Sequence, residues 1–356
     1  MRFSAHHAPQ APRRRFWILV AIVFALLALP VVVVNLSVDP FDFRLVPHRA
    51  LIRENITRKD DTMLWAAGEI RRLPQQAMDK VTLVVVGDSR TDTLCRWPGS
   101  PRIFRLGKDV VLNLSVGGAT LIENVKLLET DLPRLPKLRA VLFSAPIERV
   151  GVGDLDRADN ALRLSGWPPL YAFSLGIFAS SLDMLGEQAD GKKNGWIPQD
   201  RPDIDPKHLP DPGKAGLDVA GNNALGGKSV KLPKSEQIAA ANWRSSILRL
   251  DPARLDKRAR ELIGPIAARL RARGIQLVFF FPPLHPDVTA GIEPRITELQ
   301  RPLIAYLSQW GPVENFSLTT PDGIVPVFAD SMHLQQDVAH AVLADVYQRT
   351  LAPAKR

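Results

Sequence analysis

Cysteine is nearly absent from this sequence: Cys95 is the only one among 356 residues. The chain therefore cannot form an intrachain disulfide, and it cannot supply a cysteine-based metal cluster. Long blocks of one charge are also missing. The net charge of +9 is spread along the chain, without interleaved aromatic and basic residues. Nucleic-acid binding is therefore not expected, although affinity for an acidic polymer stays open.

An uncharged apolar run lies near the N-terminus. Residues 16–34 read FWILVAIVFALLALPVVVV, which is about the length that crosses a bilayer core. The basic cluster Arg13–Arg15 precedes this run, whereas Asp39 and Asp42 follow it. Because excess positive charge stays on the cytoplasmic side, we expect the N-terminus inside and the chain from about residue 36 outside.

The sequence is thus expected to have four parts. Residues 1–15 form a basic cytoplasmic tail, 16–34 a transmembrane signal anchor in the inner (cytoplasmic) membrane, 35–80 a juxtamembrane segment, and 81–356 a periplasmic or otherwise extracytoplasmic domain. A cleaved signal peptide is the alternative. Its apolar region is usually shorter, however, and no A-x-A site of small residues follows this run.

Beyond residue 80, short apolar runs alternate with helical patterns, a rhythm typical of βαβ proteins with a parallel sheet. The apolar runs predict strands at 83–87, 110–115, 140–146, 276–283 and 312–317. The spacing of apolar residues predicts helices over 119–131, over 252–273 and from about 335 to 351. Gly274 is expected to end the second of these helices.

Residues 186–234 break this rhythm with a stretch rich in Pro, Gly, Asp and Lys, to which no period fits. A loop of this length is usually functional or mobile. It is either a solvated insertion or a lid or docking surface over the functional site, with Trp196 as its best anchor.

Three short motifs carry the candidate chemistry. Residues 87–90 read GDSR at the end of the first strand, residues 113–118 read NLSVGG after the second strand, and residues 330–333 read DSMH before the last helix. Open α/β sheets bind ligands at the carboxyl ends of their strands. An Asp three residues before a His can fold back to hold the imidazole, as in a Ser-His-Asp triad. An ordinary Gly-Asp-Ser turn and a capped surface histidine are the alternatives.

With GDS, N-x-S-x-x-G and D-x-x-H in this order, the chain resembles the SGNH (GDSL-like) hydrolase superfamily. The resemblance covers about residues 81–146 and 275–350. It implies a flavodoxin-like three-layer α/β/α fold with a parallel sheet, and acyl-ester chemistry without metal or cofactor. By position, it implies that Ser89 is the nucleophile, His333 its general base and Asp330 the residue that orients the base.

The same resemblance implies an oxyanion hole formed by the backbone N–H groups of Gly118 and Ser89, and it places Asn113 among the groups that bind substrate. The family's G-x-N-D block after the third strand is missing, since residues 143–148 read FSAPIE. Losing one oxyanion donor typically lowers the rate by ~10²–10³.

Arg90 directly follows the predicted nucleophile, and we take it as the first candidate for a substitute oxyanion donor. A structural ion pair between Arg90 and either Asp92 or Glu148 is the alternative.

The membrane anchor, the GDSR and NLSVGG motifs and a strand ending in FPPLH are similar to the membrane-anchored SGNH proteins of cell-envelope modification. That branch includes the D-alanine transfer protein of teichoic acid systems and the alginate O-acetylation proteins. The resemblance implies a membrane-bound O-acyltransferase as partner and an envelope glycan or polymer as acceptor. His285, at the end of this strand, either contacts substrate or caps the Pro-Pro-Leu-His turn.

Three hypotheses on function follow. The first is a serine acyltransferase that moves an acyl group, expected to be acetyl, onto an envelope glycan or polymer through an acyl-Ser89 intermediate. The second is a periplasmic carbohydrate or lipid esterase with the same residues. The third is a non-catalytic scaffold of an envelope acylation complex, which the missing Asn block favours and the intact set of Ser89, Asp330 and His333 disfavours.

Overall fold

The computed structural model describes residues 11–41, 43, 51, 56–58, 62–95, 101–151, 156–189, 196–198 and 232–351. The chain forms two compact units. One unit comprises Met1–Asp61 and Arg163–Gln199, and the other comprises Thr62–Leu162 and Asp200–Arg356.

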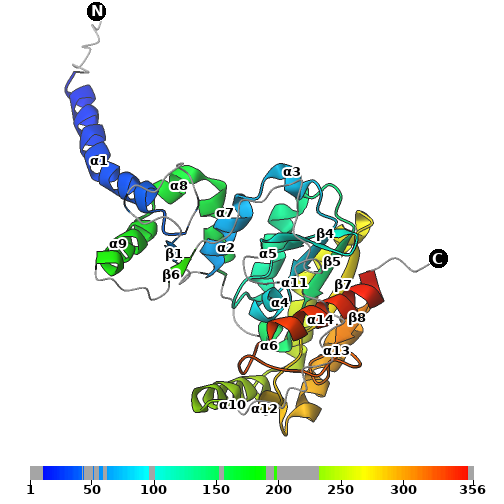
Figure 1. Cartoon of the computed structure of the whole chain (residues 1–356). Coiled ribbons are helices and arrows are strands. Elements are labelled where there is room, and N and C mark those ends of the chain that lie inside the picture. The colour runs from blue at the N-terminus through cyan, green and yellow to red at the C-terminus, as the bar shows by residue number, and fades with distance from the viewer. Residues whose placement is uncertain are drawn as a thin grey trace, which may run out of the picture. The chain divides into compact units, whose positions relative to one another are not determined.

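The larger unit is built on a six-stranded sheet with the strand order β3-β4-β2-β5-β7-β8 (Figure 1). All neighbouring strands are parallel except β3, which pairs antiparallel with β4 at one edge. The strands are β2 (Leu83–Val86), β3 (Ile103–Leu106), β4 (Asp109–Asn113), β5 (Ala140–Ser144), β7 (Gln276–Phe281) and β8 (Val313–Asn315).

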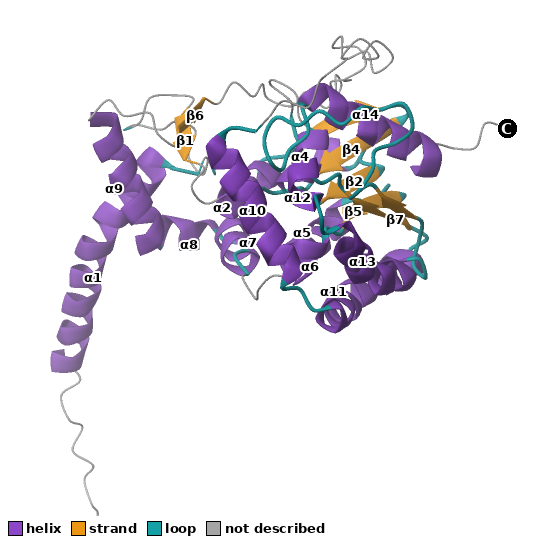
Figure 2. Cartoon of the chain, turned by 90° about the horizontal axis from the view of Figure 1, so that it is seen from below, coloured by secondary structure: helices purple, strands orange, loops and turns teal. Residues whose placement is uncertain are grey.

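Helices cover both faces of this sheet, with α14 on one side and α11 and α13 on the other (Figure 2). In chain order the helices are α2 (Thr62–Arg71), α3 (Gln75–Met78), α4 (Ser89–Leu94), α5 (Leu121–Asp131), α6 (Ile147–Gly151), α7 (Ala158–Gly166), α10 (Lys234–Leu248), α11 (Pro252–Ala272), α12 (Pro286–Thr289), α13 (Glu293–Leu307) and α14 (Gln336–Val346). A π-helical turn, Tyr347–Leu351, follows α14.

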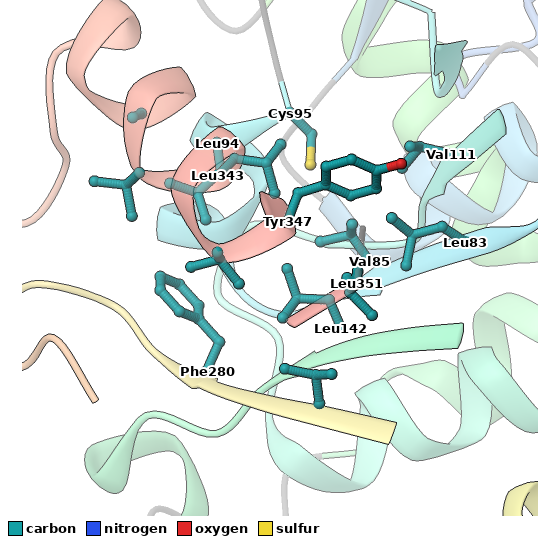
Figure 3. Close-up of a cluster of buried hydrophobic side chains, with 14 of the residues drawn as sticks. Leu83, Val85, Leu94, Cys95, Val111, Leu142, Phe280, Leu343, Tyr347 and Leu351 are labelled. Carbon is teal, nitrogen blue, oxygen red and sulfur yellow. The ribbon is translucent and has the colours of Figure 1, made fainter. Parts of the chain in front are cut away.

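The core on the α14 side arises from the alternation of side chains along the strands. Every second residue of the central strands points to this side, and α4, α14 and the π-helical turn cover them (Figure 3). The strand residues of this cluster are Leu83, Val85, Val111, Ala140, Leu142, Val278 and Phe280 from the central strands and Phe104 from the edge strand β3. Because the intervening strand residues are buried too, the central strands are continuous apolar runs, as expected when helices cover both faces of a parallel sheet.

A polar cluster fixes the amino-terminal ends of the strands. The carboxylate of Asp109, which begins β4, accepts hydrogen bonds from Thr82 Oγ1 (2.7 Å), Arg139 Nε (2.7 Å) and Tyr347 Oη (2.6 Å). Thr82 lies just before β2 and Arg139 just before β5, so one buried carboxylate joins three strands to the C-terminal π-helical turn. The three sequence motifs lie at the opposite, carboxyl ends of the strands.

The sequence predictions of a mostly parallel α/β sheet and of one long apolar N-terminal helix are confirmed. The five predicted strands correspond to β2, β4, β5, β7 and β8, and the three predicted helices to α5, α11 and α14. Gly274 has a φ of +71° directly after α11, which is the left-handed conformation that ends a helix. The edge strand β3 was not predicted, because the exposed Arg105 interrupts its apolar residues and leaves no continuous apolar run.

The smaller unit contains the long helix α1 (Ala11–Val38), together with α8 (Pro168–Phe173), α9 (Leu175–Ala189) and a short antiparallel pair formed by β1 (Ile56–Arg58) and β6 (Trp196–Pro198). The part of α1 from Arg15 to Val38 is long and apolar enough to cross a membrane. Its central and N-terminal apolar side chains are exposed, as expected for a helix whose surroundings are not protein.

Buried hydrogen bonds fasten the end of α1 to the helices that follow Arg163. The side-chain amide of Asn35 donates to the carbonyl oxygens of Ala172 and Ser174, both at 2.9 Å. Asp39 has a φ of +43°, and its carboxylate accepts from Tyr171 Oη at 2.7 Å.

The predicted Pro/Gly-rich insertion at 186–234 is described only in part. Residues 186–189 complete α9, Trp196–Pro198 form β6, and the residues from 232 onward lead into α10. The remainder, on which the lid hypothesis depends, lies outside the described residues, as do residues 1–10 of the predicted cytoplasmic tail.

Candidate active site

The GDSR motif forms the junction between β2 and the short helix α4. Asp88 is the N-cap of α4, and its Oδ1 accepts a hydrogen bond from the backbone N–H of Arg90 at 3.1 Å. Such a cap satisfies one of the otherwise free N–H groups at the start of a helix. Ser89 is the first residue of α4. The motif therefore places a serine at the carboxyl end of a central parallel strand.

Gly87 is required here by close packing. A Cβ atom at this position would lie 2.5 Å from Thr91 Cβ and 2.7 Å from Ser144 Cβ, which are distances that packed carbon atoms do not adopt. Thr91 belongs to α4, and Ser144 is the last residue of β5. The glycine thus allows α4 to turn back tightly over the ends of β2 and β5.

The serine, histidine and aspartate of the predicted triad lie together. The Oγ atom of Ser89 is 2.8 Å from Nε2 of His333. The other ring nitrogen, Nδ1, is 2.8 Å from Oδ2 of Asp330 and 3.0 Å from its Oδ1. A nucleophile, a base within hydrogen-bond reach and a carboxylate that holds the base are the geometric elements of serine nucleophilic catalysis.

Asp330 shapes the loop as well as holding the imidazole. Its Oδ1 accepts from the backbone N–H groups of Met332 (2.7 Å) and His333 (2.8 Å), which folds residues 330–333 into one tight turn. Partial burial alone would raise the pKa of Asp330, but the hydrogen bonds from His333 and from the two backbone groups outweigh it and lower the pKa. The carboxylate is therefore ionised near neutral pH.

Helix α10 holds the outer side of this turn, a role that no sequence motif indicated. The carboxylate of Glu236 accepts from the backbone N–H of Ser331 at 3.1 Å and from its hydroxyl at 2.6 Å. The indole N–H of Trp243 donates to the sulfur of Met332. Two side chains of α10 thus fix the two residues between Asp330 and His333.

Arg90 lies in a buried ion-pair cluster beneath Ser89. Its Nε and one terminal nitrogen donate to Oδ2 of Asp88 at 3.2 and 2.8 Å, and the same terminal nitrogen contacts Glu148 of α6. Arg90 is 5% exposed and Asp88 is fully buried. Of the two alternatives that the sequence left open, this geometry favours the structural ion pair, with Glu148 as partner, over a substitute oxyanion donor.

The charges of this cluster depend on one another. Burial alone would raise the pKa of Asp88, but the charge and hydrogen bonds of Arg90, with the charge of Arg149, hold the pKa below its ordinary value. Because the folded-state pKa is lowered, Asp88 contributes stability that is present above its unfolded-state pKa and is lost as the pH falls through the folded-state pKa.

Asn113 and His285 have buried side chains that bond within the protein. The amide nitrogen of Asn113 donates to Asp92 at 2.8 Å, and its oxygen accepts from the backbone N–H of Ser115 at 2.9 Å. These contacts hold the loop after β4 against α4, so the structure favours a positioning role for Asn113 over contact with substrate.

His285 caps α12, because its Nδ1 accepts from the backbone N–H of Asp287 at 3.0 Å. The ring packs edge-on against Phe328. Burial lowers the pKa of His285, although the charges of Asp287 and Asp330 oppose this effect. An accepting Nδ1 on a neutral ring leaves the proton on Nε2. This geometry favours the capping alternative for His285.

Gly118 lies in a turn stabilised by residues that the motifs did not reveal. Its φ of +70° is the left-handed conformation that favours glycine. Its carbonyl oxygen accepts from a terminal nitrogen of Arg157 at 3.1 Å, and the same guanidinium pairs with the buried Glu123 of α5. Thr120 and Glu123 form a capping box at the start of α5. The turn is thus held from both sides.

Buried apolar residues occupy the position of the missing Asn block. Ala145 and Ile147, on either side of Pro146, are both buried, and the N–H of Ala145 donates to the carbonyl oxygen of Phe280 at 3.0 Å. Residues 145–147 therefore offer no polar side chain to a substrate.

Among the described residues, no group of three or more His, Cys, Asp or Glu side chains is arranged to hold a metal ion.

We predict that Gly87→Ala destabilises the larger unit by about 1–3 kcal/mol, the usual effect of inserting an atom into a packed site. The matched control is Gly117→Ala in the same unit, because a Cβ atom there would meet only Thr62 Cγ2 at 3.7 Å, an ordinary van der Waals distance. Urea unfolding of both variants measures the difference. Equal stability of the two variants would contradict the close-packing explanation for Gly87.

We predict that Arg90→Met destabilises the protein by about 3–5 kcal/mol at pH 7, because Asp88 and Glu148 stay buried without their shared cation. The matched control is Arg349→Met, which removes an exposed partner of Asp345 and should change stability by at most about 1 kcal/mol.

The effect of Arg90→Met should depend on pH in a defined direction. Without Arg90, burial raises the pKa of Asp88, so the folded variant binds a proton more readily than its unfolded chain does. The variant should therefore recover stability relative to the wild type as the pH is lowered from 7 towards 5. A variant with unchanged stability that has lost turnover would instead identify Arg90 as an oxyanion donor.

Comparison with known proteins does not identify a family for this chain. The chain matches no protein family model, and no curated protein and no solved structure is similar to it. The assignment of a function therefore depends on the three motifs and on the site that they form.

Proposed function

We propose that this protein is a membrane-anchored, extracytoplasmic serine acyltransferase of the SGNH type. The observation that carries the proposal is the pair of hydrogen bonds on the His333 ring, to Ser89 Oγ through Nε2 and to Asp330 through Nδ1. A histidine that lies between a hydroxyl and a carboxylate can accept the proton of the hydroxyl, and the carboxylate stabilises the positive charge that the imidazole then carries.

In the first half of the reaction, Ser89 Oγ attacks the carbonyl carbon of an acyl donor, and its proton moves to Nε2 of His333. The donor's leaving group departs with that proton, which leaves an acyl ester on Ser89. In the second half, a hydroxyl of the acceptor attacks this ester and gives its proton to Nε2. Ser89 then leaves and takes the proton back. The backbone N–H groups of Ser89 and Gly118 would stabilise the two tetrahedral intermediates.

The strand order supports the SGNH type. Without the antiparallel edge strand β3, the order β4-β2-β5-β7-β8 is that of a flavodoxin-like sheet, numbered 2-1-3-4-5 along the chain. Ser89 follows the first strand of this set, and the turn with Gly118 follows the second. The first two motifs thus lie at the carboxyl ends of neighbouring parallel strands, where ligands bind in this architecture.

An esterase with the same residues is the second candidate, because water can replace the acceptor hydroxyl without any other change. A non-catalytic scaffold is the third, and the apolar segment 145–147 in place of the Asn block is the observation that favours it. The short distances within the triad favour a catalyst over a scaffold, because a scaffold has no need of a base directed at Ser89.

The apolar helix α1 supports anchoring in the inner membrane, with the basic cluster Arg13–Arg15 on the cytoplasmic side. A membrane-bound O-acyltransferase would then supply acyl groups across the membrane, and an envelope glycan or polymer would accept them. No metal or cofactor takes part in this proposal.

We predict that a serine-directed fluorophosphonate labels the full-length protein at Ser89. An unassisted serine hydroxyl is a poor nucleophile near neutral pH, so labelling reports an effective base. His333→Ala should abolish the label and Asp330→Asn should weaken it strongly. The double variant should be little worse than His333→Ala alone, because triad members act as a unit.

The matched control for this experiment is His285→Asn, which replaces a nearby buried histidine by another residue that can cap α12. This variant should keep the label. A folded, exported wild-type protein that never labels, and whose Ser89→Ala variant loses no envelope acylation, would remove the proposed function.

We predict that a reporter active only in the cytoplasm is silent when it is fused after Arg356, because the C-terminus lies outside the membrane in the proposed topology. A reporter active only outside the cytoplasm, fused at the same position, is the matched control and should be active. Strong activity of the cytoplasmic reporter would overturn the proposed localisation.

A further inference from the structure

Helix α9 of the smaller unit is apolar on two sides. The side that carries Ile177, Ser181 and Met184 is buried, and Met184 packs with Val38 at the end of α1. The side that points away from this contact is apolar as well. The polar side chains Asp183 and Glu187 lie along one edge between the two sides.

The outward side of α9 is continuous and unpartnered among the described residues. Leu175 is 72% exposed and Leu182 is 47% exposed, and both are large apolar residues seven positions apart on the same side of the helix. Ala179 lies between these two leucines and Gly186 lies one turn beyond Leu182, and both residues are also exposed. An exposed apolar stripe that is rimmed by polar side chains is a candidate binding surface.

Two exposed aromatic residues precede α9 in the same unit. Phe173, at the end of α8, is 52% exposed, and Trp167, just before α8, is 57% exposed. We call the set Trp167, Phe173, Leu175 and Leu182 the outward face. Tryptophan is enriched where a membrane meets water, because its ring is apolar and its N–H is polar.

The outward face belongs to helices that pack against the last turns of α1 (Figure 1). Asn35 bonds to the carbonyl oxygens of Ala172 in α8 and Ser174 just after it. Val34 of α1 and Leu185 of α9 both pack against the contact between Val38 and Met184. A bilayer core is crossed by about 20 residues, so a span that begins at Phe16 ends close to Asn35. The helices α8 and α9 are therefore fastened to α1 at the level where its span leaves the bilayer.

We propose that the outward face inserts into the headgroup region of the same bilayer that α1 crosses, so that α8 and α9 form a second, interfacial contact with lipid. The inference rests on the proposed membrane span of α1. Lipid is the occupant because α8 and α9 are fastened to the end of α1, where its apolar surface, which acyl chains must surround, leaves the bilayer. Amphipathic helices with exposed Trp, Phe and Leu bind membrane interfaces in this way.

The test uses the full-length protein in vesicles of phosphatidylcholine and phosphatidylglycerol. Cys95 is the only cysteine, so a Cys95→Ala background permits single labels. Leu175→Cys and Leu182→Cys are each labelled with an environment-sensitive fluorophore. The matched control is Asp183→Cys, one residue from Leu182 on the polar edge of α9. Val23→Cys reports the span of α1 itself.

The labels at 175 and 182 should emit at shorter wavelength than the label at 183. They should be quenched by lipids that carry a nitroxide more than by iodide in the water, whereas the label at 183 should show the reverse. Iodide quenching at 175 and 182 equal to that at 183, with lipid quenching at Val23→Cys, would overturn the interfacial contact and leave the anchor in place.

Labels at 175 and 182 that are shielded from both quenchers would show that protein covers the face, either a second copy or a membrane partner, and would also overturn the inference. Absence of lipid quenching at Val23→Cys would contradict the membrane span, and with it both the proposed anchor and the interfacial contact.

Discussion

The buried guanidinium of Arg90 is the interaction on which the site depends. It joins Asp88, at the end of β2, to Glu148 in the helix that follows the neighbouring strand β5. Asp88 also caps the helix that begins at Ser89, so the same carboxylate sets the start of α4 and neutralises the cation. Isolated charges are strongly destabilising in such a place, whereas a paired and hydrogen-bonded cluster is tolerated and directional. The position of the serine thus depends on this buried ion-pair cluster, together with the close packing at Gly87.

The three motifs could be predicted from the sequence because each is local. GDSR follows an apolar strand, NLSVGG precedes a capped helix, and in DSMH the carboxylate lies three residues before the imidazole that it holds. The supports of these motifs could not be predicted, since they come from distant segments. Glu236 bonds to Ser331 across 95 positions, and Arg157 bonds to Gly118 across 39. Neither side chain belongs to a pattern that periodicity or spacing would identify.

The sheet was predictable for a related reason. Central strands that are buried on both faces become unbroken apolar runs, and these runs stand out against the helices between them. The edge strand β3, with its exposed Arg105, lacks such a run. Helix α9 was not predicted because it contains the weak helix formers Gly176, Ser180, Ser181 and Gly186, and because its last four residues open the predicted Pro/Gly-rich stretch.

The hydrogen bond between Ser89 and His333 joins residues 244 positions apart, and this separation has a consequence for biosynthesis. Chains emerge from the ribosome N-terminus first. Helix α1 is therefore complete long before α14 exists, and the apolar face of β2, β4 and β5 is only partly covered, by α4, until α14 emerges. During that interval the nascent chain has a hydrophobic surface to protect and a serine without its base. The paired Ser89 and His333 arise only after the segment that carries His333 has been synthesised.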